Sequence, residues 1–240
     1  MIPIYLTTSD KTMKILPAQA YCINKFWPGQ EVHVLGYAEP TFELPENFFY
    51  HSLGRDPGPD GWSTPLIDYF KSEGPNWFIF SVDDMLPIAP VNQDMIDWLL
   101  HTHGHSGTAR IGLTNDIQQR PCHEYAGKYM VVLADNDAPY VAPWLKRTND
   151  IRYRVSTLFS IWRRQAFIDY ILPGVSPWMA EVKSIVPMSQ NVIGTRGEYA
   201  IHNSHGLFSN NIPQHKWDRC LCKQVTVDPV TREELGKLIP

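Results

Sequence analysis

The sequence predicts an α/β fold in which a mixed, mostly parallel sheet is flanked by helices on both faces. In the first 100 of the 240 residues, apolar β-prone segments alternate with amphipathic helical ones, an order typical of parallel sheets. Residues 77–82 (WFIFSV) form an almost continuous apolar run, as expected for a central strand buried on both faces. The sequence has no internal repeat, low-complexity segment or clear linker, so we expect one domain over residues 1–240.

Strands and helices are expected at the following places. The strands are predicted at residues 2–8, 31–37, 48–53, 77–82, 109–113, 129–134 and 155–161. The helices are predicted at residues 12–26, 64–73, 92–101 and 163–172. Pro17 is expected to break the first half of the first helix, and Ser63 begins the sequence Ser-Thr-Pro that predicts the cap of the second. From Pro173 onward the chain is rich in His, Asn, Ser and Gly, and we expect it to be irregular.

Composition and charge exclude several classes of protein. With 21 basic and 25 acidic residues the net charge is −4, which argues against a general nucleic-acid binder. The four cysteines, of which Cys220 and Cys222 are too close for a normal disulfide, indicate reduced thiols and a cytoplasmic location. The N-terminal segment MIPIYLTTSDK predicts a first strand rather than a signal peptide. No run of 18 apolar residues occurs, so we expect no membrane span.

Two acids, Asp83 and Asp84, follow the apolar run 77–82 directly. Ligands of open α/β sheets bind beyond the carboxyl ends of the strands, and adjacent carboxylates at a buried strand end favour a cation between them. Mn²⁺ or Mg²⁺ suits such oxygen ligands and could bridge the two phosphates of a nucleotide-sugar. Alternatively, one acid caps the next helix or pairs with a basic side chain. Spacing alone leaves both interpretations open.

Four segments in a fixed order carry a resemblance to a known family. They are TSDK after the first strand with KFWPG after the first helix, then GWS at 61–63, FIFSVDDMLP, and LFSIWRRQAFIDYILPGVSPWMAE. Together they resemble a set of uncharacterised bacterial and viral glycosyltransferases of the GT-A fold. In that family the buried strand ends in Asp-Asp, a variant of the Asp-x-Asp signature, and a later Ser-Pro-Trp precedes a glutamate by three residues. The likeness covers about residues 2–100 and 153–205.

The resemblance implies a metal-dependent transferase that moves a sugar from a nucleotide-sugar, most typically a UDP-sugar, to a hydroxyl acceptor. The acceptor would be a polysaccharide precursor or, if the protein is viral and works in the host cytoplasm, a hydroxymethylated DNA base. Residues 1–100 would bind the donor and residues 101–240 the acceptor. The implied donor contacts are Thr7, Thr8 and Asp10 at the base and ribose, Trp62 and Ser63 beside them, and Asp83 at the ribose or sugar. Asp84 would hold the metal.

Two later residues complete the implied site. Transfer to a hydroxyl requires a group that takes up the hydroxyl proton, and Glu181 would be that general base. A solvated glutamate at a helix start is the alternative for Glu181. His205, in a polar segment near the C-terminus, would add an imidazole to the metal ligands, although a single histidine is more often a surface or core residue.

Other patterns leave further alternatives open. Arg152, Arg154, Arg163 and Arg164 gather in one stretch, where they would contact the diphosphate, line a groove for DNA, or form a solvated helix face. A nucleotidyltransferase or phosphohydrolase would need a phosphate loop near the first strand, which the sequence lacks. A non-catalytic nucleotide- or carbohydrate-binding module of the same fold is the main alternative function. The presence of both the Asp pair and Glu181 favours catalysis.

Overall fold

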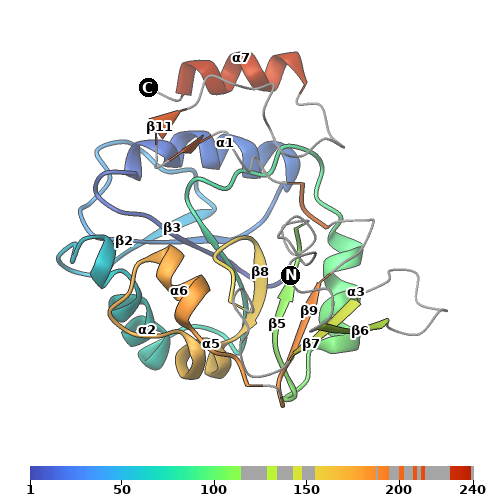
Figure 1. Ribbon diagram of the computed structural model, residues 1–240. Coiled ribbons are helices and arrows are strands. Elements are labelled where there is room, and N and C mark those ends of the chain that lie inside the picture. Colours follow the sequence, from blue (N-terminus) through green and yellow to red (C-terminus); the bar gives the residue numbers. More distant parts are fainter. Residues whose placement is uncertain are drawn as a thin grey trace.

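The computed structural model describes residues 1–114, 129–133, 143–147, 155–187, 189–194, 200–202, 208–209, 212–213 and 228–238. Helices and strands alternate through most of these residues (Figure 1). The strands are β1 (Ile4–Thr7), β2 (Val32–Gly36), β3 (Phe48–Ser52), β4 (Trp77–Val82), β5 (Thr108–Gly112), β6 (Tyr129–Leu133), β7 (Pro143–Arg147), β8 (Ser160–Arg163), β9 (Asn191–Gly194), β10 (Phe208–Ser209) and β11 (Ile212–Pro213). The helices are η1 (Met13–Ile15), α1 (Leu16–Phe26), η2 (Pro59–Gly61), α2 (Ser63–Ser72), α3 (Gln93–His103), α5 (Arg164–Tyr170), α6 (Pro177–Lys183) and α7 (Pro229–Leu238).

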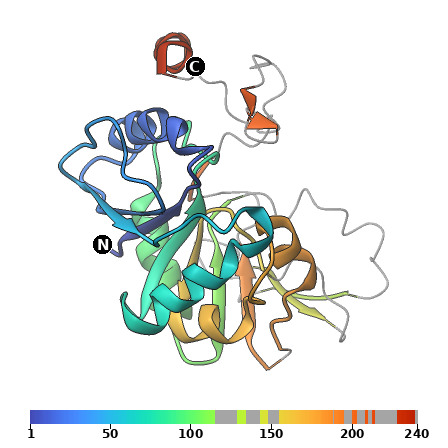
Figure 2. The same cartoon turned by 90° about the vertical axis from the view of Figure 1, so that its left-hand side faces the viewer.

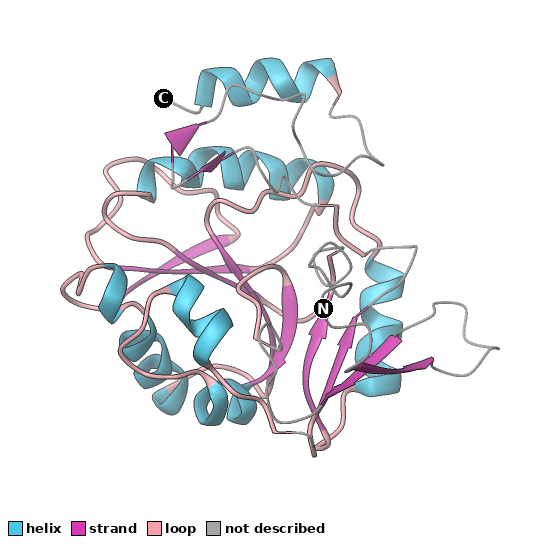
Figure 3. Ribbon diagram, viewed as in Figure 1, coloured by secondary structure: helices cyan, strands magenta, loops and turns pink. Residues whose placement is uncertain are grey.

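The main sheet has nine strands in the order β3-β2-β1-β4-β8-β5-β9-β7-β6. β8 pairs antiparallel with both β4 and β5, and β7 pairs antiparallel with β6 and β9. Every other neighbouring pair is parallel. It follows that β8 and β7 run against all the other strands of this sheet, which confirms the expected mixed and mostly parallel arrangement. β1 to β4 end together at one edge (Figure 3).

Each face of the sheet has its own hydrophobic core under a pair of helices. Along β1, Ile4 and Leu6 pack with α1 and α3 on one face, and Tyr5 packs with α2 and α5 on the other. β4 alternates in the same way, with Ile79 toward the first core and Phe78 toward the second. This is the period-two alternation of a strand buried on both sides. The expected helices on both faces are therefore confirmed.

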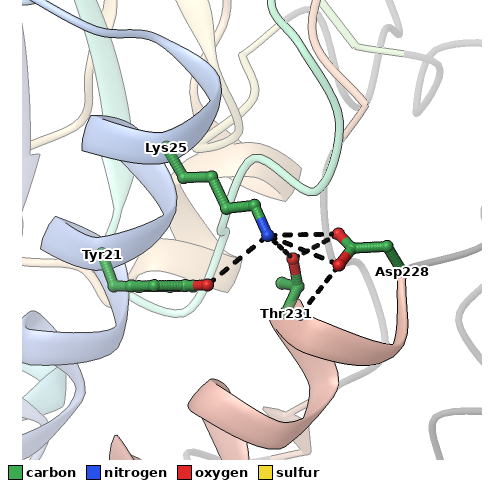
Figure 4. A network of polar contacts seen from close by, with 4 residues as sticks. All are labelled: Tyr21, Lys25, Asp228 and Thr231. Atoms are coloured by element: carbon green, nitrogen blue, oxygen red, sulfur yellow. Dashed lines mark hydrogen bonds and ion pairs between the residues drawn. The ribbon is translucent and has the colours of Figure 1, made fainter.

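The C-terminal helix α7 lies along α1, outside the sheet (Figure 2). Leu235 of α7 is fully buried and belongs to a small core with residues of α1 and with Leu86, which follows Asp84 by two positions. At the rim of this contact the Lys25 ammonium lies 2.6 Å from Thr231 Oγ1 and 3.3 Å from an Asp228 carboxylate oxygen (Figure 4). Helix α7 thus packs over α1 and the loop after the Asp pair.

Three local predictions differ from the structure. The first helix begins at Leu16 after a 3-10 turn, and Pro17 lies in its first turn, where a missing N–H is tolerated. Ser63 is not an N-cap, because η2 leads directly into α2 and Ser63 is already helical. The strand predicted at 155–161 is observed at Ser160–Arg163, since its pairing partners in β4 and β5 determine where it begins.

The chain beyond Pro173 is more regular than expected, with α6, β9 and α7 among its described elements. β7 also went unpredicted. Cys22 is buried as a free thiol, while Cys220 and Cys222 lie outside the described residues. Among the helices of the described part, none is both long and apolar enough to cross a membrane.

Candidate functional site

Two segments far apart in sequence meet at the carboxyl ends of β1 and β4. The backbone N–H of Asp83 donates to Thr7 O at 3.1 Å, which joins the residues that follow the two strands. The N–H of Val82 donates to Thr157 O at 3.1 Å, which brings the segment before β8 to the same edge. The end of β4 therefore lies between one segment from the first half of the chain and one from the second.

Asp83 is buried, with 5% of its surface exposed, and is held by hydroxyls from the start of the chain. Thr8 Oγ1 donates to Asp83 Oδ2 at 2.5 Å, and Thr8 Oγ1 lies 3.2 Å from Thr12 Oγ1. Burial raises the pKa of Asp83 to about 6, although hydrogen bonds from Thr12 and Thr8 stabilise the charged form. The predicted donor contact Thr8 is thus next to Asp83.

Asp84 is partly buried, and its Oδ1 atom is shielded from solvent. Burial, together with the negative charges of Asp83 and Glu181, raises the pKa of Asp84 to about 7. The structure therefore brings all three predicted acids together, although almost 100 residues separate Glu181 from the pair. Carboxylates gathered in this way favour a cation at the site.

Glu181 lies on α6 with 7% of its surface exposed. Its Oε1 atom accepts two hydrogen bonds from Thr157, from the backbone N–H at 2.9 Å and from the hydroxyl at 3.1 Å. Ser176 caps α6 by accepting from Met179 N at 3.3 Å. Glu181 comes in the second turn of this helix and is buried, so the alternative of a solvated glutamate at a helix start is wrong.

The loops after β1, β2 and β3 are tied together through Asp10. Its Oδ1 accepts from Ala38 N at 2.9 Å, and its own N–H donates to Asp56 Oδ2 at 3.3 Å. Beside them the buried hydroxyl of Tyr37 has no hydrogen-bond partner among the described residues. Burial, followed by the charges of Asp56 and Asp10, raises the pKa of Tyr37 to about 12. We call the loops after β1, β2 and β3 the shelf; they place hydrogen-bonding groups beyond the carboxyl ends of these strands.

Trp62 and Ser63 have different surroundings. The indole N–H of Trp62 donates to Thr7 Oγ1 at 3.3 Å, so Trp62 contacts the end of β1, and its predicted place beside a nucleotide stays a prediction. Ser63 is fully buried; its hydroxyl donates to Leu172 O at 2.8 Å and accepts from Val175 N at 3.0 Å. Ser63 thus joins α2 to the loop before α6, and its predicted contact with a nucleotide stays a prediction.

The arginines of β8 and α5, Arg163 and Arg164, lie near the start of β4, at the opposite end of that strand from the Asp pair. Arg163 pairs with Trp77, the first residue of β4, roughly 20 Å of strand away from Asp83. Its guanidinium donates to Thr108 O and Gln190 Oε1, and Arg164 donates to Glu73 O. The hypothesis that these two arginines contact a diphosphate at the Asp pair is therefore wrong; Arg152 and Arg154 lie outside the described residues.

The donor set of the site suits a divalent cation only in part. Asp83 and Asp84 supply carboxylate oxygens, which Mn²⁺ and Mg²⁺ prefer, and Mg²⁺ is commonly held by one or two carboxylates with phosphates and water. Within the described residues, no group of three or more His, Cys, Asp or Glu side chains is arranged to hold a metal ion. His205 lies outside the described residues. Further ligands would come from the substrate, from water or from other segments.

Sequence reasoning did not identify Thr12, Tyr37, Asp56 or Thr157. Thr157 was assigned to a strand, because the segment VSTLFSI is apolar and β-prone. The three hydroxyl residues within that run, Ser156, Thr157 and Ser160, were the only available signal. Tyr37 and Asp56 each follow a strand by a few residues, so their position after β2 and β3 could have pointed to the carboxyl edge.

Comparisons with known proteins give distant structural likenesses only. No family model matches the chain, and no curated protein matches it. The galactosyltransferase LgtC, solved with donor and acceptor sugar analogues, superposes with a TM-score of 0.45 and 9% identity, covering 99% of this chain and 95% of its own. CMP:2-keto-3-deoxy-manno-octonic acid synthetase, solved with CTP, gives 0.39 and 15%, covering 75% and 81%. A mycobacterial protein gives 0.42 and 11%, covering 81% of this chain, which spans 64% of that one. At these scores the likenesses identify no family.

Proposed function

We propose that this protein is a glycosyltransferase that moves a sugar from a nucleotide-sugar to an acceptor hydroxyl. The observation that carries the proposal is the convergence of Asp83, Asp84 and Glu181 at the carboxyl edge of the parallel strands. That edge is where open α/β sheets bind nucleotides. The order of the sequence motifs, with its resemblance to glycosyltransferases of the GT-A fold, supports the same class.

In the proposed reaction Glu181 is the general base. The acceptor oxygen forms a bond to the anomeric carbon while its proton passes to the Glu181 carboxylate. The bond from the anomeric carbon to the diphosphate breaks, and the diphosphate leaves with the electron pair. The two hydrogen bonds from Thr157 to Oε1 fix the orientation of the carboxylate that would take up the proton.

The remaining residues would bind the donor. Tyr37 and Asp10, on the shelf after β1 and β2, offer a buried O–H donor and a carboxylate acceptor to a nucleoside. Thr8 holds Asp83 in place beside the ribose or sugar. Asp84, together with Asp83, would hold Mn²⁺ or Mg²⁺, which when bound would balance the negative charge of the departing diphosphate.

Donor binding tests the proposal first. Thermal unfolding is measured with UDP-, GDP-, CMP- and dTDP-sugars, with and without Mn²⁺. We expect a UDP-sugar to raise the melting temperature, and to do so more strongly with the metal. If no nucleotide-sugar has an effect, the proposed function is wrong.

Turnover separates the enzyme from a non-catalytic binding module. We expect slow release of free sugar from the stabilising donor, and loss of about 10²-fold or more in Glu181→Gln with unchanged donor affinity. Donor binding without release or transfer of sugar would identify the binding module. Equal losses of affinity and turnover would make Glu181 a binding residue.

A further inference from the structure

Trp178 is unusual among the described tryptophans because its indole is exposed. It is 59% exposed, whereas Trp27, Trp62 and Trp162 are each less than 10% exposed. Trp178 lies on α6, the helix that carries Glu181. An exposed indole offers a flat apolar face with a polar N–H at its edge, which suits it to contact with a ligand.

Helix geometry puts Trp178 beside Glu181. The two residues are three positions apart, so their side chains leave the helix axis about 60° apart and one turn apart. Side chains three apart on a helix are neighbours on its surface. Lys183, the exposed cation of α6, leaves the axis about 160° from Glu181. Trp178 and Glu181 are therefore neighbouring positions on α6, whereas Lys183 leaves the helix on a different side.

Helix α6 is fixed at both ends. Ser176 caps its start, and the hydroxyl of Ser184 accepts from Leu172 N at 2.9 Å at its end. The loop before the helix is held by the two hydrogen bonds of Ser63. Leu172 and Ile185, near the end of α6, are 41% and 67% exposed. Trp178 is thus a rigid aromatic face on a helix whose surroundings are partly apolar.

We propose that Trp178 is the acceptor platform and that the acceptor is a saccharide whose ring stacks on the indole with one hydroxyl toward Glu181. This inference rests on the proposed function. A sugar ring offers an apolar C–H face and hydroxyls at its edge, which match an indole face beside a carboxylate. A DNA acceptor is disfavoured, because the negative charges of Glu181 and Asp83 both act on Asp84, which makes this part of the described site acidic. Arg163 pairs with the far end of β4, so it is not available for phosphate contacts there.

The experiment uses the full chain with Trp178→Ala, Trp178→Phe and the control Val230→Ala, which shortens another exposed apolar side chain on α7. Wild-type protein and the stabilising nucleotide-sugar are offered a printed glycan array and duplex DNA with 5-hydroxymethylated bases. The saccharide that takes up most sugar is then used in solution to measure the acceptor KM. Hydrolysis of the donor without acceptor is measured for each variant.

We expect transfer to a saccharide. Trp178→Ala should raise the acceptor KM about tenfold, Trp178→Phe less than threefold, and Val230→Ala should leave it unchanged, because only the first removes the aromatic face. Donor hydrolysis should stay within twofold of wild type in all three. Transfer to DNA, transfer to no saccharide by a protein that hydrolyses its donor, or an effect of Trp178→Ala no larger than that of Val230→Ala would overturn the proposal. A wild-type protein that neither binds nor hydrolyses any donor would instead refute the proposed function.

Discussion

Replacing Asp84 with asparagine should make the metal-free protein more stable at pH 8. The folded pKa of Asp84 is raised from 3.8 to about 7, so between these values the folded state binds more protons than the unfolded state. Stability then falls as the pH rises through this window. The cost is fully present above about pH 7 and absent below about pH 3.8. Asparagine keeps the shape of the side chain and removes the charge that causes the cost.

The size of the effect follows from the pKa. One unit of pKa corresponds to about 1.36 kcal/mol, so the difference between 3.8 and about 7 costs at most about 4 kcal/mol at pH 8. The buried amide has a desolvation cost of about 1–3 kcal/mol. The net gain in the free energy of unfolding is therefore about 1–3 kcal/mol. In a chain of this length that raises the melting temperature by roughly 2–10 °C.

Thermal unfolding at pH 8 and at pH 4, in EDTA, measures this gain. Asp84→Asn should melt above wild type at pH 8 and lose that advantage at pH 4. Asp68→Asn, which removes an exposed carboxylate 3.0 Å from Lys71, should change stability by less than about 0.5 kcal/mol at either pH. Mn²⁺ should then stabilise wild type but not Asp84→Asn. A lower melting temperature for Asp84→Asn at pH 8 would show that the hydrogen bonds accepted by the carboxylate outweigh the cost of its buried charge, and would refute this prediction.

Three further substitutions test the positioning of the site and the docking of α7. Thr157→Val removes a hydrogen bond from the hydroxyl to the Glu181 carboxylate, which is worth about 1.5–3 kcal/mol. The kcat should therefore fall about 10- to 100-fold in Thr157→Val, while the kcat of Thr157→Ser should stay within threefold of wild type. Equal losses in both variants would contradict a role for the hydroxyl. Trp62→Phe loses the bond to Thr7 and should weaken donor affinity about two- to tenfold in calorimetry, and unchanged affinity would remove Trp62 from the donor site. Leu235→Ala should lower the free energy of unfolding by about 2–4 kcal/mol in urea; a loss below 0.5 kcal/mol would mean that α7 contributes little to stability.

Sequence reasoning succeeded where the signal lies within one segment. The apolar run at 77–82 coincides with β4, because a strand buried on both faces needs apolar residues at successive positions. Asn92 caps α3 by accepting from Met95 N at 3.0 Å, so that helix begins where predicted. Asp83 and Asp84 follow β4 as expected, and their place at the carboxyl edge then follows from the sheet direction.

Prediction failed where distant contacts decide the structure. Ser63 has the sequence context of a cap, but its hydroxyl is used by Leu172 and Val175, more than 100 residues away. Thr157 precedes β8 instead of belonging to it, because β8 begins where it pairs with β4 and β5. Its contact with Glu181 depends on how α6 packs, which no local pattern encodes. The residues that orient the candidate base therefore could not be predicted from the sequence.

The position of β8 between β4 and β5 has a consequence during synthesis. Both of its neighbours leave the ribosome before it, and 47 residues lie between the end of β5 and the start of β8. At about 5–20 residues per second, the edges of β4 and β5 that β8 will cover stay open in the nascent chain for roughly 2–10 s. Such edges pair readily with other chains. Fragments that end before Ser160 should therefore aggregate, and early engagement by a chaperone should improve the yield of the full-length protein.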